Sequence, residues 1–240
     1  MKIIEKISKK NKDIYGAKPV TIAFLGDSIT QGCFECYFDE QGVQTVFDSK
    51  SSYPTRVKEI LNILYPAAQI NVINSGISGD NSINGNDRFE RDIVPFNPDL
   101  VVVAFGLNDA CQGKDKVKEY GKALESIFNK VKNIGAECIF IFQNMMNTRV
   151  SCHLKEERER SLAKTFAEIQ NTGIVELYCQ EAKKVADGCG VDFCDIYHAW
   201  TKMYENGVDV TELLSNKYNH PQRQFHYYVA IKLIEIMFEK

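Results

Sequence analysis

Four short polar segments, far apart along the chain, carry side chains of the kinds used in acyl transfer. In the first, Gly26–Thr30, Ser28 directly follows the apolar run Val20–Leu25. A serine hydroxyl is a weak nucleophile until a base takes its proton, and the oxyanion formed by its attack needs hydrogen-bond donors already in place. Ser28, next to Asp27, could also simply cap a helix, because both residue types are favoured at that position. The other three segments bear on this choice.

These segments supply candidates for the base and for the donors. Gly79 lies in the glycine-containing turn Asn74–Asn81, where a backbone N–H can approach an anion closely. The amide of Asn108, after a further apolar run, can donate another hydrogen bond to negative charge. His220 precedes Pro221, which is favoured in a first helical turn, and such a rigid position suits a general base. Each segment alone is common, so the order of the four is the specific observation.

The elements that must position these side chains are indicated by hydrophobic patterning. Continuous apolar runs rich in β-branched residues predict strands covered on both faces, at Val20–Leu25, Ile70–Asn74, Leu100–Phe105, Cys138–Phe142 and Val191–Asp195. Apolar faces at helical spacing predict helices over 53–64, over 117–134 with Gly135 ending the helix, and from Pro221 onward. The alternation predicts a five-stranded parallel sheet in a three-layer α/β/α sandwich, with the site at the carboxyl ends of the strands.

The chain reads as a single domain over residues 1–240, since no linker, repeat or low-complexity tract divides it. Residues 1–18 precede the first predicted strand and are expected to form an N-terminal extension. Two long segments, 32–50 and 144–160, follow predicted strands on the presumed active side. We expect both to be insertions beside the pocket, because long loops at strand ends often form pocket walls or lids.

Composition limits the kinds of partner. The 240 residues are 44% hydrophobic, enough for one sizeable core, and a net charge of −3 offers no electrostatic footprint for nucleic acid. The lysine-rich N-terminus has no signal-peptide core, and apolar runs of about eight residues are too short to span a bilayer. We therefore expect a cytoplasmic protein, without membrane insertion, whose partner is a small molecule.

The eight cysteines are expected to be reduced and individually buried, as is usual in the cytoplasm. Cys33 and Cys36 form a C-x-x-C pair that Cys189, Cys194 and His198 could nominally complete as a zinc site. The pair lacks a second tight pair, and Cys194 falls at an interior strand position. We accordingly predict no metal site, and His198 is interpreted as a structural histidine.

Taken in order, the four segments GDSIT, NSGISGD, GLND and NHP resemble the four blocks of the SGNH hydrolases, also called GDSL-like lipases/acylhydrolases. The resemblance runs from about residue 20 to the end of the chain, and it implies a flavodoxin-like fold. It implies Ser28 as the nucleophile and His220 as its base, with the Ser28 N–H, the Gly79 N–H and the Asn108 side chain as the oxyanion hole. It implies no cofactor, and Asp27 and Asp109 are expected only to support the turns around the site.

One position departs from the family pattern. Many members carry an aspartate three residues before the histidine, where it fixes the imidazole tautomer, but here this residue is Lys217. A lysine cannot accept that hydrogen bond. Either a backbone carbonyl near residue 217 orients His220, which we favour, or a carboxylate such as Asp209 or Glu212 folds back onto it. His226, in the last predicted helix, could buttress His220.

The resulting expectation is a serine esterase that cleaves small acyl esters through a covalent acyl-enzyme. Acetyl esters of a carbohydrate or similar metabolite are the leading substrate class, on the range of the family alone. A thioesterase or lysophospholipase of the same superfamily would need a long apolar groove. A non-catalytic flavodoxin-like binding module is the alternative from another class, and it is disfavoured because Ser28, Gly79, Asn108 and His220 are all present.

Overall fold

A parallel five-stranded sheet forms the centre of the molecule. The computed structural model describes residues 1–239. The sheet order is β4-β1-β5-β6-β7, formed by β1 (Val20–Gly26), β4 (Ile70–Gly76), β5 (Leu100–Ala104), β6 (Glu137–Phe142) and β7 (Asp192–Asp195). All five strands lie within two residues of the predicted runs, so the predicted α/β sandwich with a parallel sheet is confirmed.

The strand order places a switch point at the first strand. β1 pairs with β4 on one side and with β5 on the other, and Gly26 is level with both Gly76 and Ala104. The three strands therefore end together at one edge of the sheet. In open α/β sheets ligands bind outside the carboxyl ends of the strands where the order reverses. The first three polar segments of the sequence follow these three strands.

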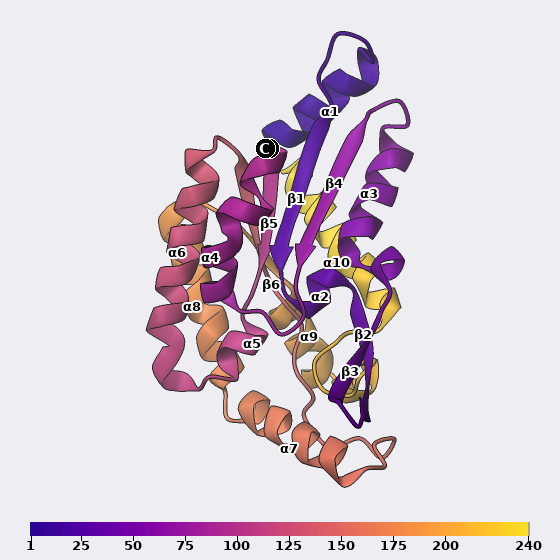
Figure 1. The fold of residues 1–240 in the computed structure, drawn as a ribbon, viewed down its shortest axis with the longest axis vertical. Helices are drawn as coiled ribbons and strands as arrows, with labels where there is room; N and C mark the ends of the chain where they lie inside the picture. The colour runs from indigo at the N-terminus through magenta and orange to yellow at the C-terminus, as the bar shows by residue number, and fades with distance from the viewer. Residues whose placement is uncertain (240) are drawn as a thin grey trace.

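Helices cover both faces of the sheet (Figure 1). One layer contains α4 (Ser82–Asp92), α6 (Val117–Asn133) and α8 (Ile174–Cys189), and the other contains α3 (Tyr53–Leu64) and α10 (Arg223–Phe238). Two short helices, α2 (Ser28–Gln31) and α5 (Leu107–Ala110), start at the ends of β1 and β5, and α9 (Ile196–Glu205) follows β7. None of the helices in residues 1–239 is long and apolar enough to cross a membrane.

The N-terminal segment is part of the fold. Residues Lys2–Lys12 form α1, and the side chains of Ile3 and Ile7 are fully buried in the main hydrophobic core. The final helix starts later than predicted, at Arg223 rather than at Pro221. Pro221 instead forms an antiparallel bridge with Leu214, which closes the loop that carries His220.

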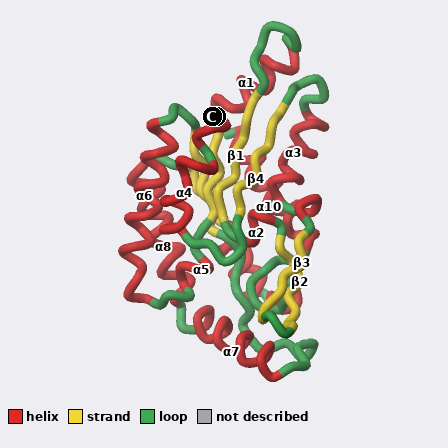
Figure 2. Tube along the Cα trace, viewed as in Figure 1, coloured by secondary structure: helices red, strands yellow, loops and turns green. Residues whose placement is uncertain are grey.

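The segment 32–50, expected from the sequence to be a long loop inserted beside the pocket, folds as a hairpin. Its strands are β2 (Cys33–Asp39) and β3 (Gly42–Phe47), and they form a sheet separate from the central one (Figure 2). The segment 144–160 leads into α7 (Glu157–Asn171), which lies beyond the carboxyl ends of the strands (Figure 1). The two segments meet where the Arg158 guanidinium lies 4.5 Å above the Phe38 ring.

Candidate active site

Ser28 is presented by the turn between β1 and α2. Asp27 is the residue that caps α2, because its Oδ1 atom accepts a hydrogen bond of 3.0 Å from the Ile29 N–H. Ser28 is the first helical residue, so its own N–H has no acceptor within the helix and its hydroxyl is not used for capping. Of Asp27 and Ser28, it is therefore Asp27 that caps the helix, and the Ser28 hydroxyl is free for other chemistry.

His220 lies directly against this hydroxyl. The distance between His220 Nε2 and Ser28 Oγ is 2.9 Å, although the two residues are 192 positions apart. The loop that carries His220 is held by Asn216, whose Oδ1 atom accepts from the backbone N–H groups of Tyr218, Asn219 and His220, each at 3.0 Å. Asn216 was not predicted from the sequence. An asparagine in a loop that must turn sharply is the only local signal for it.

A backbone carbonyl holds the other side of the imidazole. His220 Nδ1 lies 3.0 Å from the carbonyl oxygen of Phe34, in the hairpin. A backbone carbonyl is the kind of group that we favoured for orienting His220, but we expected it near residue 217. Lys217 instead extends toward Glu212, with its Nζ atom 2.9 Å from the carboxylate.

The two carboxylates considered as alternatives do not serve this purpose. Asp209 and Glu212 both bind the guanidinium of Arg149, and Glu212 also accepts from the Ser151 hydroxyl at 2.8 Å. Because the carbonyl contact joins residues 34 and 220, their sequence spacing could not reveal it.

The surroundings of His220 suit a base. A carbonyl can only accept, so Nδ1 carries the proton and Nε2 presents its lone pair to the Ser28 hydroxyl. Burial lowers the pKa of His220 to about 4, partly opposed by the Phe34 carbonyl. The imidazole is therefore neutral at pH 7. Ser28 is 4% exposed and His220 5% exposed, so the pair is almost closed off from solvent.

The candidate oxyanion donors follow the neighbouring strands. Gly79 has a φ of +79°, a conformation that a glycine adopts without strain, in the turn after β4. The Asn108 side chain, after β5, donates from Nδ2 to the carbonyl oxygen of Asp80 at 2.7 Å. This bond joins the Asn108 amide to the turn that carries Gly79.

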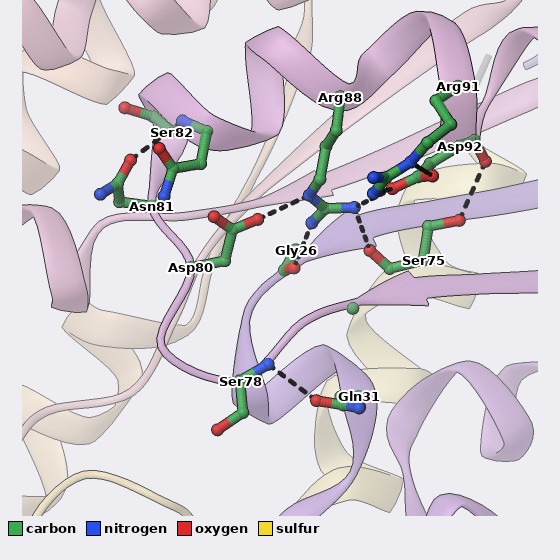
Figure 3. A network of polar contacts seen from close by, with 12 residues as sticks. Gly26, Gln31, Ser75, Ser78, Asp80, Asn81, Ser82, Arg88, Arg91 and Asp92 are labelled. Carbon is green, nitrogen blue, oxygen red and sulfur yellow. Dashed lines mark hydrogen bonds and ion pairs between the residues drawn. The ribbon is translucent and has the colours of Figure 1, made fainter.

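A buried arginine fastens this edge of the sheet (Figure 3). Arg88, on α4, binds Asp80 through Nε at 2.6 Å, the carbonyl of Gly26 through Nη2 at 2.9 Å, and the carbonyl of Ser75 through Nη1 at 2.7 Å. It thus connects the ends of β1 and β4 with the turn that carries Gly79. Sequence reasoning missed Arg88, whose partners lie up to 62 positions away.

Two buried aspartates stabilise the starts of nearby helices. Asp27 also accepts from Gln143 Nε2 at 2.8 Å, and Asp109 accepts from the Ser82 hydroxyl at 2.6 Å and from its N–H. Burial raises the pKa of Asp27 to about 7 and that of Asp109 to about 6. Both bind structural donors, in line with the supporting roles expected for them.

His226 contacts Phe34. Its ring lies 4.8 Å from the Phe34 ring, and its Nδ1 atom accepts from the backbone N–H of Tyr53 at 2.9 Å. Burial lowers the pKa of His226 to about 3, so it packs as a neutral ring. His226 therefore supports the residue whose carbonyl holds His220.

One cluster of metal-binding side chain types occurs among residues 1–239, and it differs from the set considered from the sequence. It consists of Cys179, Asp195 and His198, whose ligand atoms lie within 4.8 Å of one another. His198 Nδ1 lies 2.7 Å from Asp195, and Nε2 lies 3.3 Å from Glu176. These two carboxylates account for the orientation of His198 as a structural histidine.

The fold and the arrangement of the four segments define the class of protein. The chain has the α/β fold of SGNH hydrolases, with a serine after the first sheet strand and a histidine ahead of the last helix. The model of the GDSL-like lipase/acylhydrolase family matches residues 24–227. The chain belongs to this family, and the family name classes it among hydrolases of ester bonds.

Individual relatives are more distant. An acetylxylan esterase of Geobacillus stearothermophilus is 32% identical over 94 residues, which is 39% of this chain and 42% of that protein. The aligned region thus spans less than half of this relative.

The solved structures support the fold. A two-domain esterase active on acetylated mannans has a TM-score of 0.69 at 19% identity, over 99% of this chain and 54% of that one. A catalytic mutant of an acetylxylan esterase from Geobacillus stearothermophilus has a TM-score of 0.66 at 21% identity, over 92% of this chain and 95% of that one.

Proposed function

We propose that the protein is a serine esterase that removes small acyl groups, with acetyl esters of a carbohydrate as the substrate class. The observation that carries the proposal is the 2.9 Å contact between Ser28 Oγ and His220 Nε2, combined with a carbonyl on Nδ1 that fixes the tautomer. This is the geometry in which an imidazole can take the serine proton.

The proposed ester hydrolysis proceeds through a covalent acyl-enzyme on Ser28. His220 Nε2 takes the Ser28 proton as Oγ forms a bond to the ester carbonyl carbon. The negative oxygen of the tetrahedral intermediate accepts from the Ser28 N–H, the Gly79 N–H and the Asn108 amide. Collapse breaks the bond to the alcohol, which leaves with the proton from His220. Water, deprotonated by His220, then attacks the acyl-enzyme and releases the carboxylic acid and free Ser28.

The preference for a small acyl group rests on burial and on the relatives. Ser28 and His220 are almost fully buried, so little of the nucleophile is open to a long chain. Proteins of similar fold are described as esterases of acetylxylan and of acetylated mannans. A carbohydrate bearing acetyl groups is consistent with both observations.

The test measures hydrolysis of four substrates: p-nitrophenyl acetate, p-nitrophenyl octanoate, the acetyl thioester of p-nitrothiophenol and an acetylated xylo-oligosaccharide. We expect the acetyl oxygen esters to be cleaved fastest, and we expect Ser28→Ala to reduce this activity to background. Ser161→Ala, on the exposed face of α7, is the matched control and should retain wild-type rates. Preference for octanoate would favour a lysophospholipase, and preference for the thioester a thioesterase. Equal rates in the wild type and Ser28→Ala would favour a binding module.

A covalent probe tests the nucleophile directly. A fluorophosphonate forms a stable bond with an activated serine, and its mass should appear on the peptide that contains Ser28. The label should be absent from Ser28→Ala and present in Ser161→Ala. Labelling of another residue in wild-type protein would refute the assignment of Ser28.

A further inference from the structure

The carbonyl that orients His220 belongs to an irregular part of the hairpin. Cys33 pairs with Phe47 and Cys36 pairs with Thr45, so two residues of β2 stand opposite one residue of β3. Phe34 is one of these two residues. A bulge of this kind turns backbone groups away from the ladder, and bulges are frequent beside active sites. Here the bulge leaves the Phe34 carbonyl free to accept from His220.

A single arginine holds both sides of this bulge. Arg223 binds the Glu35 carboxylate with two guanidinium nitrogens, at 2.5 and 3.0 Å, and binds Asp48 through Nε at 2.9 Å. Its guanidinium also lies 4.2 Å above the Phe34 ring. Glu35 is the other bulge residue, and Asp48 directly follows β3. The hairpin is therefore attached at the residues that flank the carbonyl and at its return strand.

Arg223 also belongs to the segment that carries His220. It follows His220 by three residues and is the first residue of α10. The imidazole and the guanidinium therefore share one short stretch of backbone, and they contact neighbouring residues of the hairpin. Arg223 thus forms a second attachment between the two segments that the contact of His220 Nδ1 with the Phe34 carbonyl also joins.

We propose that Arg223 and Glu35 are positioning residues, which clamp the bulge so that the Phe34 carbonyl replaces the missing aspartate in orienting His220. The proposal rests on the esterase function proposed above. The Arg223 and Glu35 side chains are 34% and 44% exposed, so the pair contributes little to stability. Its effect should appear in turnover, because displacing a catalytic group by about 1 Å can reduce the rate by about 10²-fold.

The test uses Glu35→Gln, Arg223→Met and the double variant, with p-nitrophenyl acetate as substrate. Each single variant should lower kcat by about tenfold or more and leave KM within about twofold, since the clamp acts on the base rather than on binding. The double variant should be no slower than the slower single variant, because both substitutions remove one clamp. The two substitutions remove opposite charges, so rates that change in opposite directions would show an electrostatic effect and overturn the proposal. A kcat within twofold of wild type in both would also overturn it.

Arg158→Met is the matched control. It releases the far end of the same hairpin, at Phe38, without touching Phe34 or Glu35. Its kcat should equal that of the wild type, and a tenfold loss there would show that any loosening of the hairpin is harmful and would overturn the specific role of Arg223.

A measurement without substrate separates this proposal from the esterase proposal. In ¹⁵N-histidine-labelled wild-type protein, the shifts of His220 should report a single tautomer with the proton on Nδ1. In Glu35→Gln and Arg223→Met they should move toward tautomer averaging. If the wild type hydrolyses no ester but the shifts change in this way, the positioning role of Arg223 and Glu35 is supported and the esterase function is refuted. If the wild type is active and the shifts do not change in the variants, only the positioning role is refuted.

Discussion

His220 Nδ1 and the Phe34 carbonyl oxygen lie 3.0 Å apart, and they join residues separated by 186 positions. The carbonyl is a dipole without net charge, so it fixes the tautomer while doing less than a carboxylate to stabilise the imidazolium. Burial acts in the opposite direction and keeps the ring neutral. The balance between these two effects sets the pH at which the base becomes protonated.

The acid limb of the pH–rate profile should lie well below the ordinary pKa of histidine. In the proposed mechanism His220 must be neutral to take the Ser28 proton, and burial lowers its pKa to about 4. We therefore expect kcat/KM to rise through about pH 4 and to be nearly level by about pH 6. Initial rates with p-nitrophenyl acetate, after subtraction of the Ser28→Ala rate at each pH, measure this. A limb near pH 6.5, with activity that recovers on return to pH 7, would contradict the expectation.

Asn108→Ala should slow turnover strongly. The substitution removes one donor of the proposed oxyanion hole, and it releases the 2.7 Å contact with the Asp80 carbonyl. Loss of one such donor costs about 10² to 10³ in kcat, with a small effect on KM. Asn206→Ala is the control, because that side chain donates to the carbonyl of Lys202 at the end of α9. A kcat for Asn108→Ala within about threefold of wild type would remove Asn108 from the oxyanion hole.

The central sheet could be predicted because its strands are buried along their whole length. All five residues of Leu100–Ala104 are buried, and the sequence there is an uninterrupted apolar run. The hairpin gives a weaker signal, since no residue of β3 is buried and its sequence, Gly-Val-Gln-Thr-Val-Phe, is neither a continuous apolar run nor a regular alternation. Gly42, with a φ of +112° and β-branched residues after it, is the local hairpin signal that we did not use.

The site could be predicted only where its residues lie in short segments whose order is distinctive. Ser28 and His220 were found in this way, and the structure brings them together. Phe34 contacts His220 through its backbone carbonyl, a group that every residue possesses, so no residue type marks it. Arg88 acts through carbonyls at the ends of two strands, and those partners are defined only when the sheet has formed.

Asp27→Asn should change how stability depends on pH. Burial raises the folded-state pKa of Asp27 to about 7, against an ordinary value of 3.8, so the folded state binds this proton more tightly than the unfolded state. Wild-type protein therefore loses stability through Asp27 as the pH rises from about 4 through about 7. An asparagine oxygen can accept the same bonds from Ile29 and Gln143 without ionising.

Urea unfolding across this pH range gives the measurement. The free energy of unfolding of Asp27→Asn, relative to wild type, should rise between about pH 4 and 7, by a few kcal/mol in order of magnitude. Subtracting the free energy of unfolding of the wild type from that of the variant at each pH cancels the contributions of other titrating groups. Asp115→Asn, which removes a carboxylate at an exposed position, is the matched control. A difference for Asp27→Asn that does not change between about pH 4 and 7 would mean that the pKa of Asp27 is not raised.

Arg88→Met should destabilise the protein and slow turnover together. Arg88 is 8% exposed, and its removal leaves the Asp80 carboxylate, 5% exposed, without the guanidinium that pairs with it. Breaking a buried pair on one side costs about 3 to 5 kcal/mol, because a buried charge then remains uncompensated. Asp80 also carries the carbonyl that binds Asn108, so we expect a loss in kcat as well. Urea unfolding and initial rates measure the two effects.

Two further variants separate the charge from the position of the side chain. Arg91→Met removes a neighbouring arginine that binds Asp92, a carboxylate that Arg88 also binds at 2.9 Å. The Arg91 side chain is 70% exposed, so its loss should change neither stability nor kcat appreciably. Arg88→Met combined with Asp80→Asn removes the orphaned charge. It should recover much of the stability, while the carbonyls of Gly26 and Ser75 stay without their donor and kcat stays low. If the double variant regained full activity, the loss in Arg88→Met would come from the uncompensated Asp80 charge rather than from a displacement of the turn that carries Gly79.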